Sequence, residues 1–156
     1  SYGTPASPSL CSGVAGKENA GKVTELNRLV IEEGAEKNCA SLLVGKSLKL
    51  LPKPRIVVSY ADTGHNHVGK VYQATNFLYT GATLERTDVD TGENKHSRHY
   101  EGMDMSKRKI RTSKHRYIFL LGEEKEILKY KIQPYPKGES KRYDSGEVLT
   151  KQEMLF

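Results

Sequence analysis

The side chains best suited to chemistry are gathered in one short stretch, which contains Asp62, His65, His67 and Tyr72. A carboxylate and two imidazoles can bind a divalent metal such as iron or zinc, and a histidine can act as a general base. The His-x-His spacing places both rings on one side only where the backbone is extended. The structural alternatives are turn histidines that hydrogen-bond the backbone and a core tyrosine whose hydroxyl is satisfied.

A second candidate site is the N-terminus of a helix. Asn38 is a typical N-cap residue, and the residues after it predict a helix over Cys39–Leu51 that ends at Pro52. The free amide groups around Asn38, Ala40 and Ser41 would then form an anion site. No GxGxxG motif or P-loop is present, so an ordinary capped helix is the alternative.

Positive charge is the third feature. The 156 residues include 25 Lys and Arg against 19 Asp and Glu, and the stretch 107–142 alone has 12 Lys and Arg against 4 Glu. This balance favours polyanionic partners, and the interleaved His115 and tyrosines can stack on extruded bases. A solvated basic surface is the alternative. The cations predicted to contact nucleic acid are Lys107, Arg108, Lys109, Arg111, Lys114 and Arg116.

A strand, a turn and a helix must position the first candidate site. The β-branched and aromatic run over Arg55–Tyr60 predicts a strand that is buried on both faces. Apolar residues spaced i, i+3, i+4 and i+7 predict a helix over Val68–Asn76, with Asn76 as its stop, and Phe77–Gly81 is expected to be another strand. Ligands of open α/β sheets bind beyond strand C-termini, which is where this turn lies.

The strand predicted before the anion site covers Lys22–Ile31, bent by a bulge at Leu26-Asn27 where the alternation slips. Within it, Arg28 is either an anion contact or an exposed edge residue. The other segments carry weaker signals. We expect a loop or frayed edge strand over Ser1–Ser12, a long polar loop over Thr83–Lys109, a strand over Ser113–Leu121, and a strand or short helix over Glu126–Ile132.

Length and composition indicate a single domain with a core over about 10–82, a polar insertion over about 83–110 and a basic part over about 111–143. Cys11 and Cys39 are far apart and form no CxxC pair, so we expect free thiols and a reducing cytoplasm. No apolar run approaches the roughly 18 residues of a membrane span, so no membrane partner is expected.

Short motifs run through most of the chain. They are Leu26-Asn27-Arg28-Leu29, Lys37-Asn38-Cys39-Ala40-Ser41, Leu48-Lys49-Leu50-Leu51-Pro52, Ser59-Tyr60-Ala61-Asp62, the block from His67 to Gly81, Lys95-His96-Ser97-Arg98-His99, Ser113-Lys114-His115-Arg116-Tyr117 and Tyr135-Pro136-Lys137-Gly138. Together they resemble the bacteriophage Mom family of DNA-modification proteins over roughly Gly3 to Arg142. The block from His67 to Gly81 is the most specific part of this resemblance.

The resemblance implies an α+β fold like that of the GNAT acyltransferases, a mixed sheet flanked by helices. Lys22–Ile31 would be its central splayed strand, Glu32–Ser41 the turn that meets the pyrophosphate of coenzyme A, and Val68–Asn76 the helix whose tyrosine faces the reaction centre. A GNAT domain normally begins with a strand and two helices, which this chain, starting at Ser1 rather than Met, would lack. Either a missing segment or a partner would then complete the N-terminal part, or the protein is degenerate.

The resemblance also implies an unusual reaction, the conversion of adenine in double-stranded phage DNA to an N6-carbamoylmethyl (acetamido) form. This change shields the DNA from host restriction, which places the protein in the host cytoplasm. The implied cofactors are acetyl-CoA (or CoA) and iron. By the same resemblance, Asp62 and Tyr72 are the acid/base or metal-binding pair, and Arg28 and Ser41 are cofactor or active-site contacts.

Two other functions fit the sequence. The first is a generic GNAT N-acyltransferase acting on a small amine or a protein, which needs the same cofactor but not the basic C-terminal half. The second is a non-catalytic DNA-binding relative, which would bind DNA with steep salt dependence and without acetyl-CoA.

Overall fold

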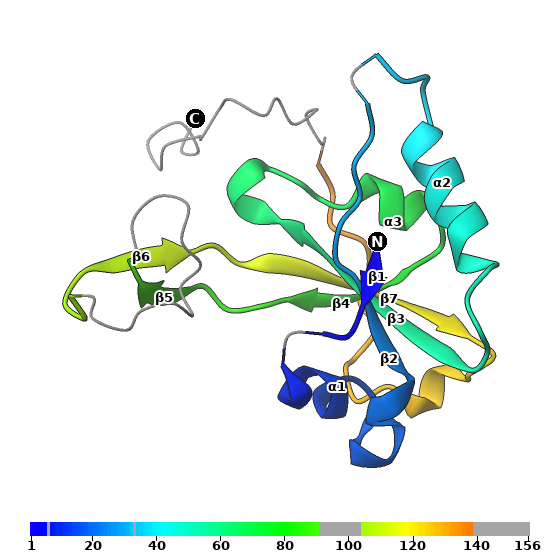
Figure 1. Ribbon diagram of the computed structural model, residues 1–156, viewed down its shortest axis with the longest axis horizontal. Coiled ribbons are helices and arrows are strands. Elements are labelled where there is room, and N and C mark those ends of the chain that lie inside the picture. Colours follow the sequence, from blue (N-terminus) through cyan, green and yellow to red (C-terminus); the bar gives the residue numbers. More distant parts are fainter. Residues whose placement is uncertain (6, 33, 91–103, 139–156) are drawn as a thin grey trace.

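The computed structural model describes residues 1–5, 7–32, 34–90 and 104–138, and its body is a five-stranded mixed sheet (Figure 1). In spatial order the strands are β1 (Tyr2–Gly3), β2 (Val23–Leu26), β3 (Arg55–Asp62), β7 (Lys114–Leu121) and β4 (Leu78–Ala82). The β2–β3 pair is parallel and the other neighbouring pairs are antiparallel. The predicted α+β class with a mixed sheet is therefore confirmed.

Helices lie on both faces of this sheet (Figure 1). Before β3 come α1 (Pro8–Ala15), the 3-10 helix η1 (Lys17–Lys22) and α2 (Cys39–Leu48). After β3 come η2 (Thr63–His65), α3 (Lys70–Ala74) and, beyond β7, η3 (Lys125–Ile127). No helix in the described ranges combines the length and the apolar character that a membrane crossing needs.

The side chains of β3 alternate between two separate cores. Val57 and Ala61 pack with α2 and α3, and we call this side of the sheet the α2 face. Ile56 and Val58 pack with Cys11, Val14 and Ala15 of α1, and we call that side the α1 face. Because both faces are covered, β3 is buried on both sides, as its sequence predicted.

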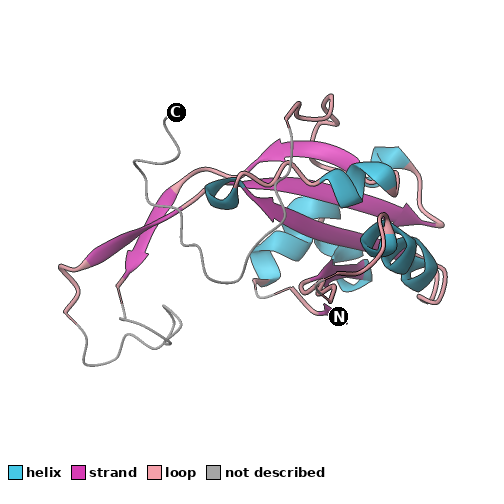
Figure 2. Ribbon diagram, turned by 90° about the horizontal axis from the view of Figure 1, so that it is seen from above, coloured by secondary structure: helices cyan, strands magenta, loops and turns pink. Residues whose placement is uncertain are grey.

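A second, two-stranded sheet stands apart from the body. It pairs β5 (Arg86–Val89) with β6 (Arg108–Arg111) in antiparallel register. Figure 2 shows this β5–β6 ribbon extending away from the five-stranded sheet and the helices. The sequence predicts a long polar loop or insertion over Thr83–Lys109, and the described part of that segment forms a strand pair rather than a loop. The pairing joins distant segments, so local patterning does not reveal it.

Three strand predictions are confirmed with small changes of bounds. The strand expected over Arg55–Tyr60 continues to Asp62, and the strands expected over Phe77–Gly81 and Ser113–Leu121 are β4 and β7. The strand expected over Lys22–Ile31 was wrong beyond Leu26. Beyond Leu26, Leu29 packs only at the edge of the core and Val30 is 72 % exposed, so this segment buries too little to continue the strand.

The helix predictions were right in place and wrong in length. α2 begins at Cys39 as expected but ends at Leu48, because the following amides, starting with Lys49, donate to carbonyls three residues back. α3 is shorter than the expected Val68–Asn76. Gly69 has φ +73°, outside the helical region, and delays its start, while Asn76, with φ +61°, lies at the predicted stop.

Two further segments differ from expectation. The loop or edge strand expected over Ser1–Ser12 does contain β1, but it also contains most of α1. Pro8 lies at the helix start, where its missing N–H costs nothing, and burial of Val14 holds the helix down. The segment Glu126–Ile132 contributes only the end of η3. Cys11 and Cys39 are free thiols, as predicted.

Candidate functional site

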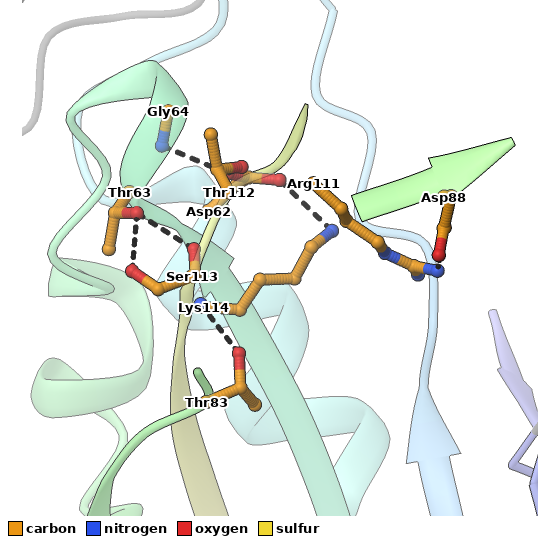
Figure 3. A network of polar contacts seen from close by, with 9 residues as sticks. All are labelled: Asp62, Thr63, Gly64, Thr83, Asp88, Arg111, Thr112, Ser113 and Lys114. Carbon is orange, nitrogen blue, oxygen red and sulfur yellow. Dashed lines mark hydrogen bonds and ion pairs between the residues drawn. The ribbon is translucent and has the colours of Figure 1, made fainter. Parts of the chain in front are cut away.

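The carboxylate of Asp62, the last residue of β3, holds the linker between β6 and β7 (Figure 3). Its Oδ1 accepts hydrogen bonds from the Thr112 hydroxyl at 2.5 Å and from the Gly64 amide at 2.9 Å. Its Oδ2 pairs with Lys114 Nζ at 3.0 Å. We call Asp62, Gly64, Thr112 and Lys114 the Asp62 clamp. Both carboxylate oxygens are engaged in it.

The clamp sets the ionisation of its carboxylate. Burial on its own raises the pKa of Asp62, but hydrogen bonds from Thr112, Lys114 and Gly64, together with the Lys114 charge, lower the pKa below its ordinary value of 3.8. The group is therefore ionised at neutral pH. Because the charged form is stabilised, Asp62 is also a weaker base than an ordinary carboxylate.

The linker is held from two sides (Figure 3). On one side, the Thr63 hydroxyl donates to the Ser113 carbonyl at 2.8 Å, and the Thr63 amide donates to the same oxygen at 3.2 Å. On the other side, the Lys114 amide donates to the Thr83 hydroxyl, and the Thr83 amide donates to the Lys114 carbonyl, both at 2.9 Å. The root of the β5–β6 ribbon is thus fixed to the end of the sheet.

Tyr72 projects from α3 into the α2 face. Its ring centroid lies 5.4 Å from that of Phe77 and 5.3 Å from that of Tyr117. Its hydroxyl lies near the Ser59 side chain, which lowers the pKa of Tyr72, and Ser59 Oγ itself donates to the Leu26 carbonyl at 2.9 Å. Leu26 ends β2, so the Tyr72 hydroxyl lies beside the C-terminal part of the parallel pair.

Burial raises the pKa of Tyr72, and the hydrogen bond with Ser59 opposes that rise only in part. The phenol therefore keeps its proton at neutral pH and is available as a hydrogen-bond donor or acid.

Asp62 and Tyr72 meet the same end of β3 from opposite faces. Ser59 and Ala61 point to the α2 face, where Tyr72 lies, whereas Tyr60 packs on the α1 face. Side chains alternate along a strand, so Asp62 belongs to the α1 face. We expected the two residues to meet at one mouth. Their contacts instead form two separate networks.

The two histidines lie at the turn after β3. Their ring centroids are 6.0 Å apart, and the His67 amide donates to the Asp62 carbonyl at 3.1 Å. Burial lowers the pKa of His67, the neighbouring His65 lowers it further, and Asp62 opposes both effects. The lower pKa favours a neutral imidazole, the form that binds metals.

The predicted iron ligands, Asp62, His65 and His67, do not form a metal site in the structure. Within the described ranges, no three His, Cys, Asp or Glu side chains come together in a way that could hold a metal ion. The Asp62 oxygens are already engaged in the clamp. His96 and His99, in one of the motifs, lie outside the described residues. We therefore derive no reaction step through a metal.

The first turn of α2 is the predicted anion site. Asn38 adopts a left-handed conformation, with φ +69°, and its side chain makes no capping hydrogen bond, so the predicted cap position was right and its chemistry wrong. The Ser41 hydroxyl donates to the Asn38 carbonyl at 2.9 Å. No acidic residue lies in this turn, so the amides near Ala40 and Ser41 meet no nearby negative charge.

Arg28 lies in the loop that follows β2, and its side chain is exposed. Because β2 and β3 run parallel, this loop leaves the sheet at the end where Asp62 lies. The residue is therefore placed to reach a ligand at that end, and its role as a cofactor contact stays a prediction.

The cations predicted to bind nucleic acid fall into two groups. Lys107, Arg108 and Lys109 are exposed at the β5–β6 ribbon. The others are engaged within the chain. Arg111 pairs with Asp88 at 3.2 Å, Lys114 belongs to the Asp62 clamp, and Arg116 donates to Thr80 at 2.9 and 3.0 Å and lies 3.4 Å from the Tyr130 ring centroid. Arg108 Nη2 also donates to the Thr87 carbonyl at 3.0 Å, so within the described residues Lys107 and Lys109 are the exposed cations of this set best placed for a partner.

Sequence reasoning missed a second polar pair on the α2 face. The Tyr79 hydroxyl hydrogen-bonds His115 Nδ1 at 2.9 Å, and burial raises the pKa of Tyr79 and lowers that of His115. Beside it, Gln73 Nε2 donates to the Tyr117 hydroxyl at 3.1 Å. The alternation of His115 and Tyr117 along one strand is the signal that could have placed them on one face.

The arrangement defines a mixed α+β protein with a parallel strand pair, a buried tyrosine donor and an exposed basic ribbon. A comparison with family models then identifies the group to which it belongs. The model of the Mom protein family matches residues 1–137, so the chain belongs to the Mom protein family, which is associated with DNA modification in bacteriophages. A comparison with curated proteins finds no match.

Proposed function

We propose that this protein is an enzyme that converts adenine in double-stranded DNA to its N6-carbamoylmethyl form, and that this protects phage DNA from host restriction. The observation that carries the proposal is the family match over residues 1–137. The reaction needs a pocket that receives an extruded base, because an adenine inside the duplex does not expose N6 to a side chain.

Tyr72 is the residue we assign to the chemistry. The exocyclic N6 of adenine is a poor nucleophile because its lone pair is delocalised into the ring. A reaction there is helped by a donor that stabilises developing or departing negative charge. The Tyr72 phenol keeps its proton at neutral pH because burial raises its pKa, and its ring is half-buried among the rings of Phe77 and Tyr117. A protonated hydroxyl in that position is available to donate to a reacting atom.

The fold we propose is GNAT-like, with acetyl-CoA as the cofactor. The parallel pair β2–β3 corresponds to the splayed strands of that fold, and α2 to the helix that meets the pyrophosphate. The amides near Ala40 and Ser41 would bind the phosphates, and exposed Arg28 would add a positive charge at the same end of the sheet. When bound, acetyl-CoA would supply the two carbons of the added group; joining its methyl carbon to N6 also needs a two-electron oxidant, and the amide needs an ammonia-level nitrogen that displaces CoA.

For Asp62 we propose a positioning role rather than proton removal. Its charge is stabilised by Thr112, Gly64 and Lys114, and the first two of these occupy Oδ1 while the third occupies Oδ2. A carboxylate in that state fixes the geometry of the linker. It would have to break the clamp before it could accept a proton or bind a metal.

The test is nucleoside mass spectrometry of DNA from cells that express the intact protein, beside calorimetry of the purified protein with acetyl-CoA. We expect modified adenine and saturable cofactor binding. Cofactor binding with unmodified adenine would indicate a generic N-acyltransferase instead. Salt-dependent DNA binding with no cofactor binding would indicate a non-catalytic relative.

A further inference from the structure

The β5–β6 ribbon is the part of the described chain that lies outside the two cores. Its register pairs Thr87 with Ile110 on one side of the ribbon and Asp88 with Lys109 on the other. Ile110 is 49 % exposed, and Lys109 is exposed as well. The ribbon therefore presents an apolar side chain and cations to the surroundings.

Negative charge is unevenly placed on this ribbon. Asp88, on β5, pairs with both Arg86 at 3.5 Å and Arg111 at 3.2 Å, so its single negative charge offsets only one of these two positive charges. β6 and the residue before it carry no acid, and the run Lys107-Arg108-Lys109 is exposed. The edge formed by β6 is thus electropositive, and its complement is a polyanion.

The length of the ribbon is compatible with the major groove of double-stranded DNA. Each strand has four residues, which at about 3.3 Å per residue span about 13 Å. The major groove of B-DNA is about 12 Å wide and 8.5 Å deep and admits a two-stranded β-ribbon. The groove walls carry phosphates on both sides, and its floor offers thymine methyl groups to an apolar side chain.

The ribbon is also fixed relative to the candidate site. The linker after β6 is held by the Asp62 clamp and by Thr83, so the ribbon leaves the body at the end of the sheet where Asp62 lies (Figure 3). A duplex bound on the ribbon would therefore pass this end of the sheet. Two elements fixed to each other in this way can act on one DNA molecule.

We infer that the β5–β6 ribbon enters the major groove of double-stranded DNA, with Ile110 against the base edges and Lys107 and Lys109 on the flanking phosphates. This inference rests on the proposed function for its choice of DNA as the partner. Beyond the proposed function, it specifies which element binds the DNA, which groove that element enters and which side chains contact bases or phosphates.

The first test removes the phosphate contacts. In the double variant Lys107→Ala/Lys109→Ala, the slope of log affinity for a duplex against log salt should fall in magnitude by about 2, because each lost phosphate contact removes about 0.9. The matched control is Lys46→Ala/Lys49→Ala, which removes two exposed lysines at the far end of α2 and should keep the parental slope. An unchanged slope in the ribbon variant overturns the inference.

The second test removes the apolar contact. Ile110→Ser should weaken duplex binding about tenfold while keeping the salt slope, since no charge is lost. Leu43→Ser is the control, because Leu43 is exposed to a similar degree, 47 % against 49 %, on α2. If Ile110→Ser instead turns a dimer into a monomer and leaves DNA affinity unchanged, the ribbon is a contact between two copies and the inference is wrong.

The groove is tested by competition with the parent protein. Methyl green, which occupies the major groove, should displace the protein, and netropsin, which occupies the minor groove, should not. The reverse result overturns the assignment of the groove. If the parent protein modifies adenine and the ribbon variants bind DNA as tightly as the parent, this inference is wrong and the proposed function stands. If the parent protein neither binds a duplex nor modifies adenine, the proposed function is wrong as well.

Discussion

The two faces of the sheet differ in how their polar groups are held where β3 ends. On the α1 face, the Asp62 carboxylate uses both oxygens to bind Thr112, Gly64 and Lys114. On the α2 face, the Tyr72 hydroxyl lies near Ser59 within an aromatic cluster. A carboxylate held by three partners fixes geometry, whereas a protonated hydroxyl is able to donate to a ligand. Asp62 and Tyr72, which the sequence predicts to act as a pair, thus have different roles in the fold.

The largest effect is expected at Tyr72, whose hydroxyl is proposed to act in the reaction. Tyr72→Phe should reduce modified adenine at least a hundredfold, the usual effect of removing a donor that acts in the transition state. The aromatic packing is retained, so the unfolding free energy should fall by only about 1 kcal/mol for the lost hydrogen bond. Mass spectrometry of the DNA and urea denaturation of the purified protein measure the two effects.

Tyr135→Phe is the matched control for that variant. The Tyr135 hydroxyl donates to the Phe77 carbonyl at 2.7 Å, and its ring is 6.4 Å from that of Tyr117, so it also loses a hydroxyl beside the aromatic cluster. We expect a similar loss of stability with modification retained. Equal loss of modification in both variants would show that the cluster matters only as packing.

The clamp is tested by a double-mutant cycle. Asp62→Asn keeps an acceptor for Thr112 but loses the charge that faces Lys114, and should destabilise the protein by about 1–2 kcal/mol. Lys114→Met should remove most of the same interaction, so the two changes together should cost less than their sum, with a coupling of about 1 kcal/mol.

Modification measured across the same cycle separates positioning from catalysis. If Asp62 acts through the linker, modification should follow the loss of folded structure, and Lys114→Met should lower it as well. If Asp62→Asn abolishes modification in a protein of parental stability, and Lys114→Met does not, Asp62 is an acid, a base or a metal ligand as first predicted.

The site shows what local sequence can and cannot reveal. The strand over Arg55–Tyr60 was predictable, because a run of β-branched and aromatic residues that follows Pro52 and Pro54 and precedes the turn Asp62-Thr63-Gly64 is typical of a strand. The position of Tyr72 after it was predictable from helical spacing. The partners of Asp62 were not, because Thr112 and Lys114 lie about fifty residues away and reach it only through the β3–β7 pairing.

The ribbon shows the same limit. β5 is short and mixed in polarity, and its residues are ordered by pairing with β6 rather than by a core of their own. The opposite faces of Asp62 and Tyr72 also follow from alternation along β3, which the sequence contains. That alternation becomes informative only once the helices that cover each face are known.

A smaller effect is expected at the first turn of α2, and it tests whether the α2 face is the cofactor side. Ser41→Glu places a negative charge and extra volume beside amides proposed to bind phosphates, and should weaken CoA binding roughly fivefold to tenfold in calorimetry. Ser9→Glu adds the same charge to the first turn of α1 and is the control. If Ser41→Glu binds CoA with the affinity of the parent protein, the CoA phosphates do not bind at the first turn of α2.

The smallest effect is the pH dependence of the clamp. The folded-state pKa of Asp62 is lowered, so its contribution to stability is fully present above the unfolded-state pKa and is lost as the pH falls through the folded-state value. The difference in unfolding free energy between the parent and Asp62→Asn should therefore be constant near neutral pH and shrink below about pH 4.

Urea denaturation at several pH values measures this difference. The control is Asp104→Asn, because Asp104 is an exposed residue whose pKa is lowered by Ser106 alone. That control should show a smaller difference throughout. A parent-to-Asp62→Asn difference that grows on acidification would mean that the Asp62 carboxyl is held in its protonated form, and the α1 face would then hold an acid rather than a clamp.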